Sequence, residues 1–319
     1  MTGITDPEMN IIDFSEIRAF PFPKSYITIG NFDGVHRGHQ AILKEMLRLA
    51  GSDDMPVIVV TFFPNPTDFF NQRGQGFYLT TPREKEDLIR AMGVAEVMTL
   101  RFDRRFADLS PKAFLSSLKE KLGLQTLVIG LDFTLGKARQ GTIPVIKSIG
   151  EELSFSVEVI SPIRLGQDEI SSTAIRQHLD AGKVHAAAEL LGRLYAVSGK
   201  VAHGSDRGSK IGLPTANLSQ WPQKKLPGVG VYATYVAVGG GTYQGITNIG
   251  YRPTFEDQRL PNVETHILGF DGNIYGTEIT LAFLKKIRDE QKFNGVETFL
   301  EQIEKDKAAA QRIFKHDQT

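Results

Sequence analysis

The chain has 319 residues, and its 37 lysines and arginines balance 37 aspartates and glutamates, so the formal net charge is zero. A neutral chain argues against a nucleic-acid binder with a broad basic field and against a polybasic membrane anchor. Hydrophobic residues make up 41% of the chain, enough for a sizeable core, and the absence of cysteine excludes disulfides, thiolate nucleophiles and cysteine-ligated metals. The length favours two domains.

The N-terminal segment 1–10 contains Asp6 and Glu8 and has no apolar centre, so we expect no signal peptide. No uncharged apolar stretch is long enough to span a bilayer. A chain without cysteine also fits a reducing compartment. We therefore expect a soluble cytoplasmic protein.

The first half of the chain alternates short apolar strands with helical patterns. Strands are predicted at Tyr26 to Ile29, Val57 to Phe63, Val94 to Leu100, Thr126 to Ile129 and Ser156 to Ile160. Helices are predicted at Gln40 to Ala50, Arg83 to Met92 and Pro111 to Leu122. This alternation predicts an α/β fold, with a parallel sheet covered by helices on both faces.

The second half is rich in strands. They are predicted at Tyr195 to Val201, Val231 to Val238, Thr242 to Ile249, Val263 to Phe270 and Glu278 to Leu284. Gly239, Gly240 and Gly241 indicate a hairpin, and a helical pattern follows from Val296 to Phe314. The pattern favours a small antiparallel barrel or sandwich.

Two helical segments, interrupted at Gly182, are predicted between these halves, from Ser171 to Leu191. We therefore divide the chain into a first domain over residues 1–185 and a second over residues 186–319.

The segment Gly30 to His39 follows the first of the five predicted strands in the first half and opens the next helix. Its glycines allow close backbone approach to a ligand, and a helix N-terminus favours anions. His36 and His39 are three residues apart, so they would face the same side of a first helical turn. Two imidazoles that donate hydrogen bonds beside free backbone N–H groups would stabilise the negative charge that develops on a phosphate during its transfer. Turn glycines with solvated histidines remain an alternative, whereas a metal site lacks a third ligand.

This ten-residue string resembles the H-x-G-H signature of nucleotidyltransferases, and in particular the G-x-F-D-G-x-H-x-G-H form of bacterial bifunctional riboflavin kinase/FAD synthetases. Three further segments resemble that family in the same order: T-F-x-P-x-P from Thr61 to Pro66, G-x-D-F from Gly130 to Phe133, and I-S-S-T-x-I-R from Ile170 to Arg176. The resemblance implies a Rossmann-like nucleotidyltransferase domain that transfers AMP from ATP to FMN, giving FAD and pyrophosphate.

The resemblance also implies roles for individual residues. His36, His39 and Arg176 would carry catalysis by positioning two polyanions, since the FMN phosphate needs no general base. ATP would contact Gly30, Phe32, Gly38, Asp132, Ser172 and Thr173, and flavin would contact Pro64 and Pro66. Helix capping by Ser172 and Thr173, and loop stiffening by the two prolines, are the alternatives for those residues.

A second glycine-rich segment runs from Gly199 to Leu218 and lacks the Gly-Lys-Ser/Thr ending of a Walker A loop. Thr215 and Asn217 offer hard oxygen ligands for Mg²⁺, although four residues of Pro-Thr-Ala-Asn alone also fit a turn. The segment resembles the G-x-x-x-G-x-x-x-G-F-P-T-A-N motif of riboflavin kinases. The family match implies ATP binding at Gly204 and Gly212, flavin binding at Arg288, and a six-stranded antiparallel Greek-key barrel with a C-terminal helix.

Riboflavin presents a primary alcohol, so a carboxylate is needed to orient it and take its proton. By resemblance that carboxylate is Glu264, in the string Val-Glu-Thr-His. The alternative is that Glu264 is only a solvated charge on the face of a strand. Ser209 and Leu213 depart from the Arg and Phe usual in the family, and the missing arginine removes a charge-assisted contact near the phosphates. Lys210 or Arg207 could replace that contact.

The leading hypothesis is therefore a bifunctional enzyme that converts riboflavin to FMN and then to FAD with ATP and Mg²⁺. Two alternatives remain: an enzyme with only one of these activities, and a flavin- or nucleotide-binding sensor without turnover. A Ser-His-Asp hydrolase has no support, because the chain has no G-x-S-x-G string. Small molecules are the expected partners, without nucleic acid or membrane, and oligomerisation is not readable from the sequence.

Overall fold

A computed structural model describes residues 10–19, 22–161, 164–165, 168–203, 213–251 and 261–317, without side chains for 164, 165, 168 and 169. The chain forms two compact units, Met1–Ser172 and Thr173–Thr319. Within the described residues, no helix is long and apolar enough to cross a membrane.

The first unit contains a six-stranded sheet in the order β1-β4-β3-β2-β5-β6, and every neighbouring pair is parallel. The strands are β1 (Ile11–Ile12), β2 (Ser25–Ile29), β3 (Val57–Phe63), β4 (Glu96–Arg101), β5 (Leu124–Gly130) and β6 (Ser156–Ile160). The predicted parallel sheet is confirmed, with the two-residue β1 as an unpredicted strand at one edge.

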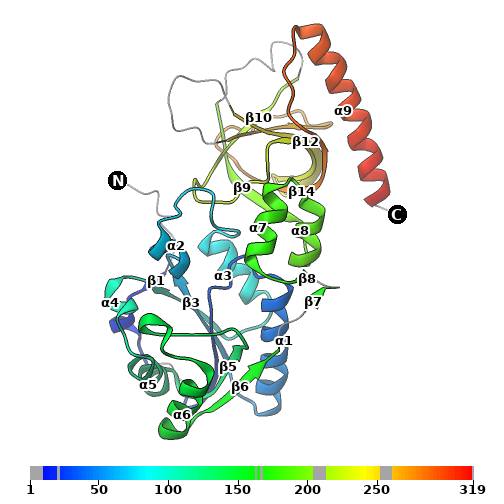
Figure 1. The fold of residues 1–319 in the computed structure, drawn as a ribbon. Coiled ribbons are helices and arrows are strands. Elements are labelled where there is room, and N and C mark those ends of the chain that lie inside the picture. The colour runs from blue at the N-terminus through cyan, green and yellow to red at the C-terminus, as the bar shows by residue number, and fades with distance from the viewer. Residues whose placement is uncertain are drawn as a thin grey trace. The chain divides into compact units, whose positions relative to one another are not determined.

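Helices cover both faces of this sheet, as Figure 1 shows for α1 on one side and α5 and α6 on the other. Leu43 of α1 and Ile89 of α3 pack on one face, and Leu115 of α5 and Ile146 of α6 pack on the other. The helices are α1 (Arg37–Ser52), α2 (Pro66–Asn71), α3 (Pro82–Arg90), α4 (Arg104–Ala107), α5 (Pro111–Leu122) and α6 (Ile143–Leu153), with 3₁₀ turns at Phe14–Glu16 and Lys137–Arg139.

The strand order has a consequence for ligand binding. Strands β3 and β4 lie on one side of β2, whereas β5 and β6 lie on the other, so the chain changes direction across the sheet between β2 and β5. In open α/β sheets, ligands bind outside the carboxyl ends of the strands at this switch point. The loop after β2 is therefore where a ligand is expected.

The second unit is a closed barrel in the order β10-β13-β12-β11-β14-β9, and its neighbouring strands pair antiparallel. Strand β14 lies beside β11, with β12 and β13 following in space, which is the Greek-key order. The strands are β9 (Tyr195–Ala202), β10 (Ala216–Gln220), β11 (Gly230–Val238), β12 (Gly241–Gly250), β13 (Asn262–Ile267) and β14 (Glu278–Arg288). The expected six-stranded barrel is thus confirmed.

The triple glycine forms the predicted hairpin. Val238 pairs with Gly241, so Gly239 and Gly240 are the two turn residues. Their φ angles of 57° and 80° lie in the left-handed region. Two such residues in a two-residue loop fit a type I′ turn, which glycine adopts without steric cost.

Three helices complete the second unit: α7 (Ser172–Asp180), of which only Ser172 clusters with the first unit, α8 (Val184–Leu191) and α9 (Val296–Asp317). Gly182, with a φ of 68°, separates α7 from α8 as predicted. The helix α9 packs on β11, β12 and β14, where Phe314 and Ala310 bury against Val231 and Leu284. A short antiparallel pair, β7 (Arg164–Leu165) and β8 (Asp168–Glu169), precedes α7.

The division between the units falls before the expected boundary at residues 185 and 186. The reason is packing, since α8 lies against β9 and β14 of the barrel. The linking helices α7 and α8 therefore fold with the second unit, and the boundary at 185 stays a proposal about the catalytic domains.

Candidate active sites

The loop between β2 and α1 lies at the carboxyl edge of the parallel sheet. Phe32 and Val35 have φ angles of 49° and 41°, although bulky and β-branched side chains rarely adopt positive φ. Both side chains are only 2% exposed, so the surrounding core holds them in this conformation. Backbone strain of this kind costs about 1–3 kcal/mol per residue and concentrates at functional sites.

Asp33 fixes this loop to the segment before α3. Its Oδ1 accepts hydrogen bonds from the backbone N–H groups of Leu79 at 3.0 Å and Thr80 at 3.2 Å. The Thr80 hydroxyl oxygen in turn accepts from the Gly34 N–H at 3.1 Å. Asp33 is 3% exposed, so this carboxylate is a buried structural anchor rather than a solvated charge.

His36 and His39 lie together at the start of α1. His36 is the N-cap, and its Nδ1 accepts the His39 backbone N–H at 3.4 Å. The rings stack with centroids 3.7 Å apart and 19° between their planes. Because Nδ1 of His36 is an acceptor, its neutral ring carries the proton on Nε2, where it can donate.

The imidazole of His39 is held neutral. Burial lowers the pKa of His39 well below its usual value, with smaller contributions from His36 and Lys85. Its Nδ1 is buried and has no hydrogen-bond partner among the residues that the structure describes. An orphaned buried nitrogen is costly unless a ligand supplies the partner, so the pair of rings fits a polar ligand such as a phosphate.

The glycines near this loop have different reasons to be small. A Cβ on Gly38 would lie 3.1 Å from Nδ1 of His36, and a Cβ on Gly30 would lie 2.9 Å from the Phe32 ring. A side chain at either position would displace a predicted site residue. Gly30, Phe32, Gly38, His36 and His39 are thus brought together by the structure.

The neighbouring strand ends carry further predicted residues. Pro64 and Pro66 follow β3, and Pro66 opens α2, whose N-cap Asn65 accepts the Thr67 N–H. Asp132 follows β5 and is exposed. Its Oδ1 lies 3.1 Å from the place a Cβ on Gly130 would take. Since β3, β2 and β5 are adjacent parallel strands, their ends share one edge of the sheet.

The hydroxyl of Ser172, the last residue of the first unit, donates to the Asp33 carbonyl of the histidine loop at 2.9 Å. Thr173 is exposed and Arg176 half-buried, both on α7 in the part that clusters with the second unit. Their contacts with nucleotide stay predictions.

In the barrel, a row of polar residues crosses three strands. Glu264 of β13 pairs in register with Asn217 of β10 and with Asn248 of β12. Directly paired residues share a face, and the neighbours Val263 and Thr265 are fully buried inside the barrel. The row therefore lies on the outer face, where the Asn262 amide donates to Glu264 Oε1 at 2.6 Å.

Thr215 is half-buried immediately before β10. The preceding Pro214 carbonyl accepts a hydrogen bond from Nδ1 of His266 at 2.9 Å, which ties Pro214 to β13. No local sequence pattern predicts this role of His266 or the place of Asn248. Only the register of β13 with its neighbours could have revealed them.

Gly204 and Gly212, together with Arg207, Ser209 and Lys210, lie outside the described residues. Leu213 is 8% exposed, so the departure from Phe keeps a buried apolar position.

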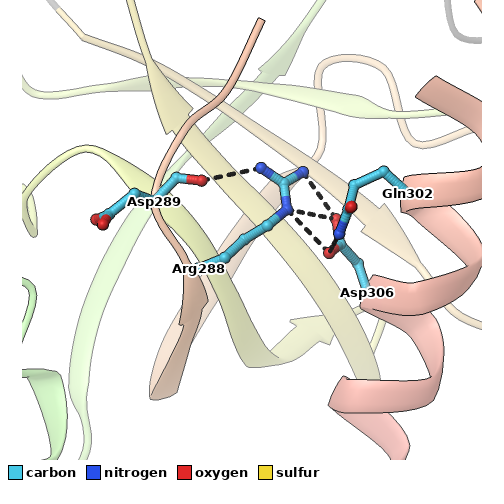
Figure 2. A network of polar contacts seen from close by, with 4 residues as sticks. All are labelled: Arg288, Asp289, Gln302 and Asp306. Carbon is cyan, nitrogen blue, oxygen red and sulfur yellow. Dashed lines mark hydrogen bonds and ion pairs between the residues drawn. The ribbon is translucent and has the colours of Figure 1, made fainter. Parts of the chain in front are cut away.

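The structure places Arg288, the expected flavin-binding residue, at the end of β14 against α9 (Figure 2). Its Nε and Nη2 donate to the Asp306 carboxylate at 2.9 and 2.8 Å, and Nη1 donates to the Asp289 carbonyl at 2.9 Å. The Gln302 amide also donates to Asp306, which is 1% exposed. Arg288 thus anchors α9, and its contact with flavin stays a prediction.

Comparison with known proteins supports both candidate sites, the histidine loop of the first unit and the polar row of the barrel. The family model for FAD synthetase matches residues 21–174, and the one for riboflavin kinase matches residues 191–314. The bifunctional riboflavin kinase/FMN adenylyltransferases of Bacillus subtilis and Escherichia coli are 38% and 39% identical, over 92% and 90% of this chain and 93% and 92% of theirs.

A similar solved structure is described as a macrolide-efflux protein from Streptococcus pneumoniae. It is 30% identical, with a TM-score of 0.86 over 94% of this chain and 97% of that one. Two family matches in the expected order, together with relatives of this identity over nine tenths of the chain, leave one assignment. The chain belongs to the bifunctional riboflavin kinase/FMN adenylyltransferase family.

Proposed function

We propose that this chain makes FAD from riboflavin in two ATP-dependent steps, each carried out by one of its two structural units. The observation that carries the proposal is that the first unit holds a stacked histidine pair at its sheet edge, and the second holds a carboxylate, Glu264, in register with two asparagines on the barrel. The two chemistries need different groups, and each unit holds the set that one of them needs.

In the adenylyl transfer, a phosphate oxygen of FMN attacks the α-phosphorus of ATP and the bond to pyrophosphate breaks. The FMN phosphate is already largely dianionic, because its second pKa lies near ~6. The task is to hold two polyanions and stabilise charge on the transferred group. His36 and His39, at the start of α1, donate hydrogen bonds there.

In the kinase step, the terminal hydroxyl of the ribityl chain attacks the γ-phosphorus of ATP and ADP leaves. Glu264 accepts the proton of that hydroxyl, and the Asn262 amide orients the carboxylate. Flanking Asn217 and Asn248 lie on the same face, so the carboxylate lies between two amides.

Thr215 and Asn217 fit a magnesium ion, because hydroxyl and amide oxygens are hard ligands that Mg²⁺ accepts alongside phosphates. Both are half-buried in the chain that leads into and through β10. They would hold the ion that accompanies ATP, and the bound ion supplies positive charge to the phosphates.

The test uses pure protein with ATP and Mg²⁺, given riboflavin in one reaction and FMN in another, with the products separated by chromatography. FMN and FAD from riboflavin, and FAD from FMN, support the proposal. FMN alone identifies a single kinase, FAD from FMN alone identifies a single adenylyltransferase, and no product identifies a binding protein.

A further inference from the structure

We infer that Lys85 is a positioning residue for adenylyl transfer, which locks the histidine loop to the end of β3 and places a fixed positive charge beneath the anion site. The inference rests on the function proposed above. Lys85 lies in the middle of α3 and is 6% exposed, although lysine is rarely buried without partners.

Each hydrogen of the Lys85 ammonium has an acceptor. Nζ lies 3.3 Å from the Asn31 carbonyl, 2.9 Å from the Thr61 hydroxyl oxygen and 3.2 Å from the Phe62 carbonyl. An ammonium has three donors, so none remains for a substrate. Lys85 therefore acts through the residues that it holds rather than by touching ATP or FMN.

These acceptors belong to the two segments that form the site. Asn31 lies in the loop after β2, whereas Thr61 and Phe62 end β3 and lead into the segment with Pro64 and Pro66. The Thr61 hydroxyl also donates to the Asn31 carbonyl at 3.1 Å, which closes a ring of contacts. One side chain thus fixes the histidine loop and the expected flavin segment in a single geometry.

The segment just before α3 holds the loop at a second point. Asp33 accepts the backbone N–H groups of Leu79 and Thr80, just before α3 begins at Pro82. Asp33 also interacts electrostatically with Lys85 and favours its charged form. Lys85 of α3 therefore holds Asn31 at one end of the segment, and Leu79 and Thr80 before the helix hold Asp33 at the other.

The charge itself has a use at this place. The carbonyl oxygens of Asn31 and Phe62 carry partial negative charge in the segments that form a site for polyanions. A buried ammonium on these oxygens offsets them in a medium of low dielectric. It also opposes protonation of His39, whose pKa it lowers together with burial and His36.

The pH dependence of adenylyl transfer distinguishes a role of the Lys85 charge from a role in packing alone. Burial lowers the pKa of Lys85 from 10.5 to about 8, against the opposing effect of Asp33. Adenylyl transfer should therefore fall above pH 8 as the ammonium is lost. Unfolding is not the cause there, because a group whose folded pKa is lowered makes the folded state more stable as pH rises in that window.

The experiment measures FAD formation from FMN by Lys85→Met, Lys85→Arg and Lys147→Met proteins, the last a matched control at an exposed lysine of α6. Lys85→Met should lower kcat about 10²-fold, since misplacement of about 1 Å costs that much. KM for ATP and FMN should stay within about twofold, because no substrate contact is removed. The kinase rate of each protein reports that the second unit is intact.

Lys85→Arg keeps the charge, so it should retain more FAD formation than Lys85→Met and lose the decline above pH 8, because arginine stays protonated. If Lys85→Met does not fold, the pH profile of Lys85→Arg still tests the inference. Wild-type kcat in Lys85→Met, or an unchanged alkaline decline in Lys85→Arg, overturns the inference. A wild-type protein that makes no FAD from FMN instead overturns the proposed function.

Discussion

Gly38 and His36 are packed so closely that a methyl group at position 38 would lie 3.1 Å from the imidazole Nδ1. It would also lie 3.2 Å from Cε1 of the same ring and in van der Waals contact, at 3.5 Å, with the Ile170 carbonyl. We therefore expect Gly38→Ala to displace the His36 ring and to lower FAD formation by roughly 10²-fold, as small displacements at reacting groups do. The rate is measured with FMN and ATP.

The same helix supplies the control for that change. Gly51, in the last turn of α1, has no atom within 4 Å of an added Cβ, and Gly51→Ala gains the same helix propensity of about 1 kcal/mol. It should keep wild-type FAD formation. Equal rates in the two alanine variants would mean that the space beside His36 has no bearing on the reaction.

His39 should make the first unit less stable in acid. The folded protein holds this imidazole neutral, mainly through burial, whereas the unfolded chain takes up a proton below about pH 6.5. The unfolded state then binds more protons, so the free energy of unfolding falls as pH falls, by at most about 1.4 kcal/mol per pH unit. His39→Gln should remove this part of the acid sensitivity.

Denaturant unfolding at pH 7.5 and pH 5.5, followed by circular dichroism, measures that difference. Trp221 is the single tryptophan of the chain and lies in the second unit, so its fluorescence reports the barrel separately. An equal acid loss of stability in wild type and His39→Gln would refute the neutral, buried state of this ring.

Helices and strands whose ends are marked by caps, prolines or glycines could be predicted from the sequence with exact bounds. The helix from Pro111 to Leu122 has Ser110 as N-cap, proline at its first position and Gly123 in the left-handed conformation after it. The strand from Val57 to Phe63 is a β-branched and aromatic run with proline on either side. In both cases the signal lies within the segment and its immediate neighbours.

Elements that depend on their neighbours were missed. Strand β1 has two residues, too few to show an alternation of apolar and polar side chains, and it forms because it pairs with β4. Strand β10, Ala-Asn-Leu-Ser-Gln, has five residues and none that is β-branched or aromatic, and it forms because β9 and β13 flank it. Helix α1 was expected from Gln40 but begins at Arg37, since a histidine serves as its N-cap.

The candidate site divides in the same way. The histidine loop was recognisable because its residues are contiguous, and the structure brings five of them together. Lys85 looked like any charged residue of an amphipathic helix, and Asp306 like a surface charge. Their burial comes from contacts with Thr61 and Arg288 across the fold, which no local pattern contains.

Glu264 should be required for kinase turnover but not for riboflavin binding. Glu264→Gln keeps the shape and removes the proton acceptor, so kcat for FMN formation should fall about 10²- to 10⁴-fold. Asn262→Ala removes only the donor that orients the carboxylate, so it should cause a smaller fall. Steady-state rates and riboflavin titration separate the two effects.

Adenylyl transfer from added FMN is the internal control, because it occurs in the other unit. Wild-type kinase turnover in Glu264→Gln would remove this residue from the reaction. If riboflavin no longer binds to that variant, Glu264 is a binding group instead.

Arg288 and Asp306 should stabilise the barrel as a pair. Three donors, two from Arg288 and one from Gln302, converge on a carboxylate that is 1% exposed. Arg288→Met leaves that charge buried and unpaired, which costs about 3–5 kcal/mol. The double variant Arg288→Met/Asp306→Leu should recover most of this loss, because an apolar pair replaces a buried ion pair at little cost.

Trp221 fluorescence during denaturant unfolding measures the stability of these variants, and kinase assays on the stable double variant separate two roles of Arg288. If Arg288 only anchors α9, the double variant keeps the wild-type KM for riboflavin. A raised KM in a protein of restored stability would instead show that the guanidinium also contacts the flavin. A double variant as unstable as Arg288→Met would contradict the buried pair, since the unpaired carboxylate would then not be the cause of the instability.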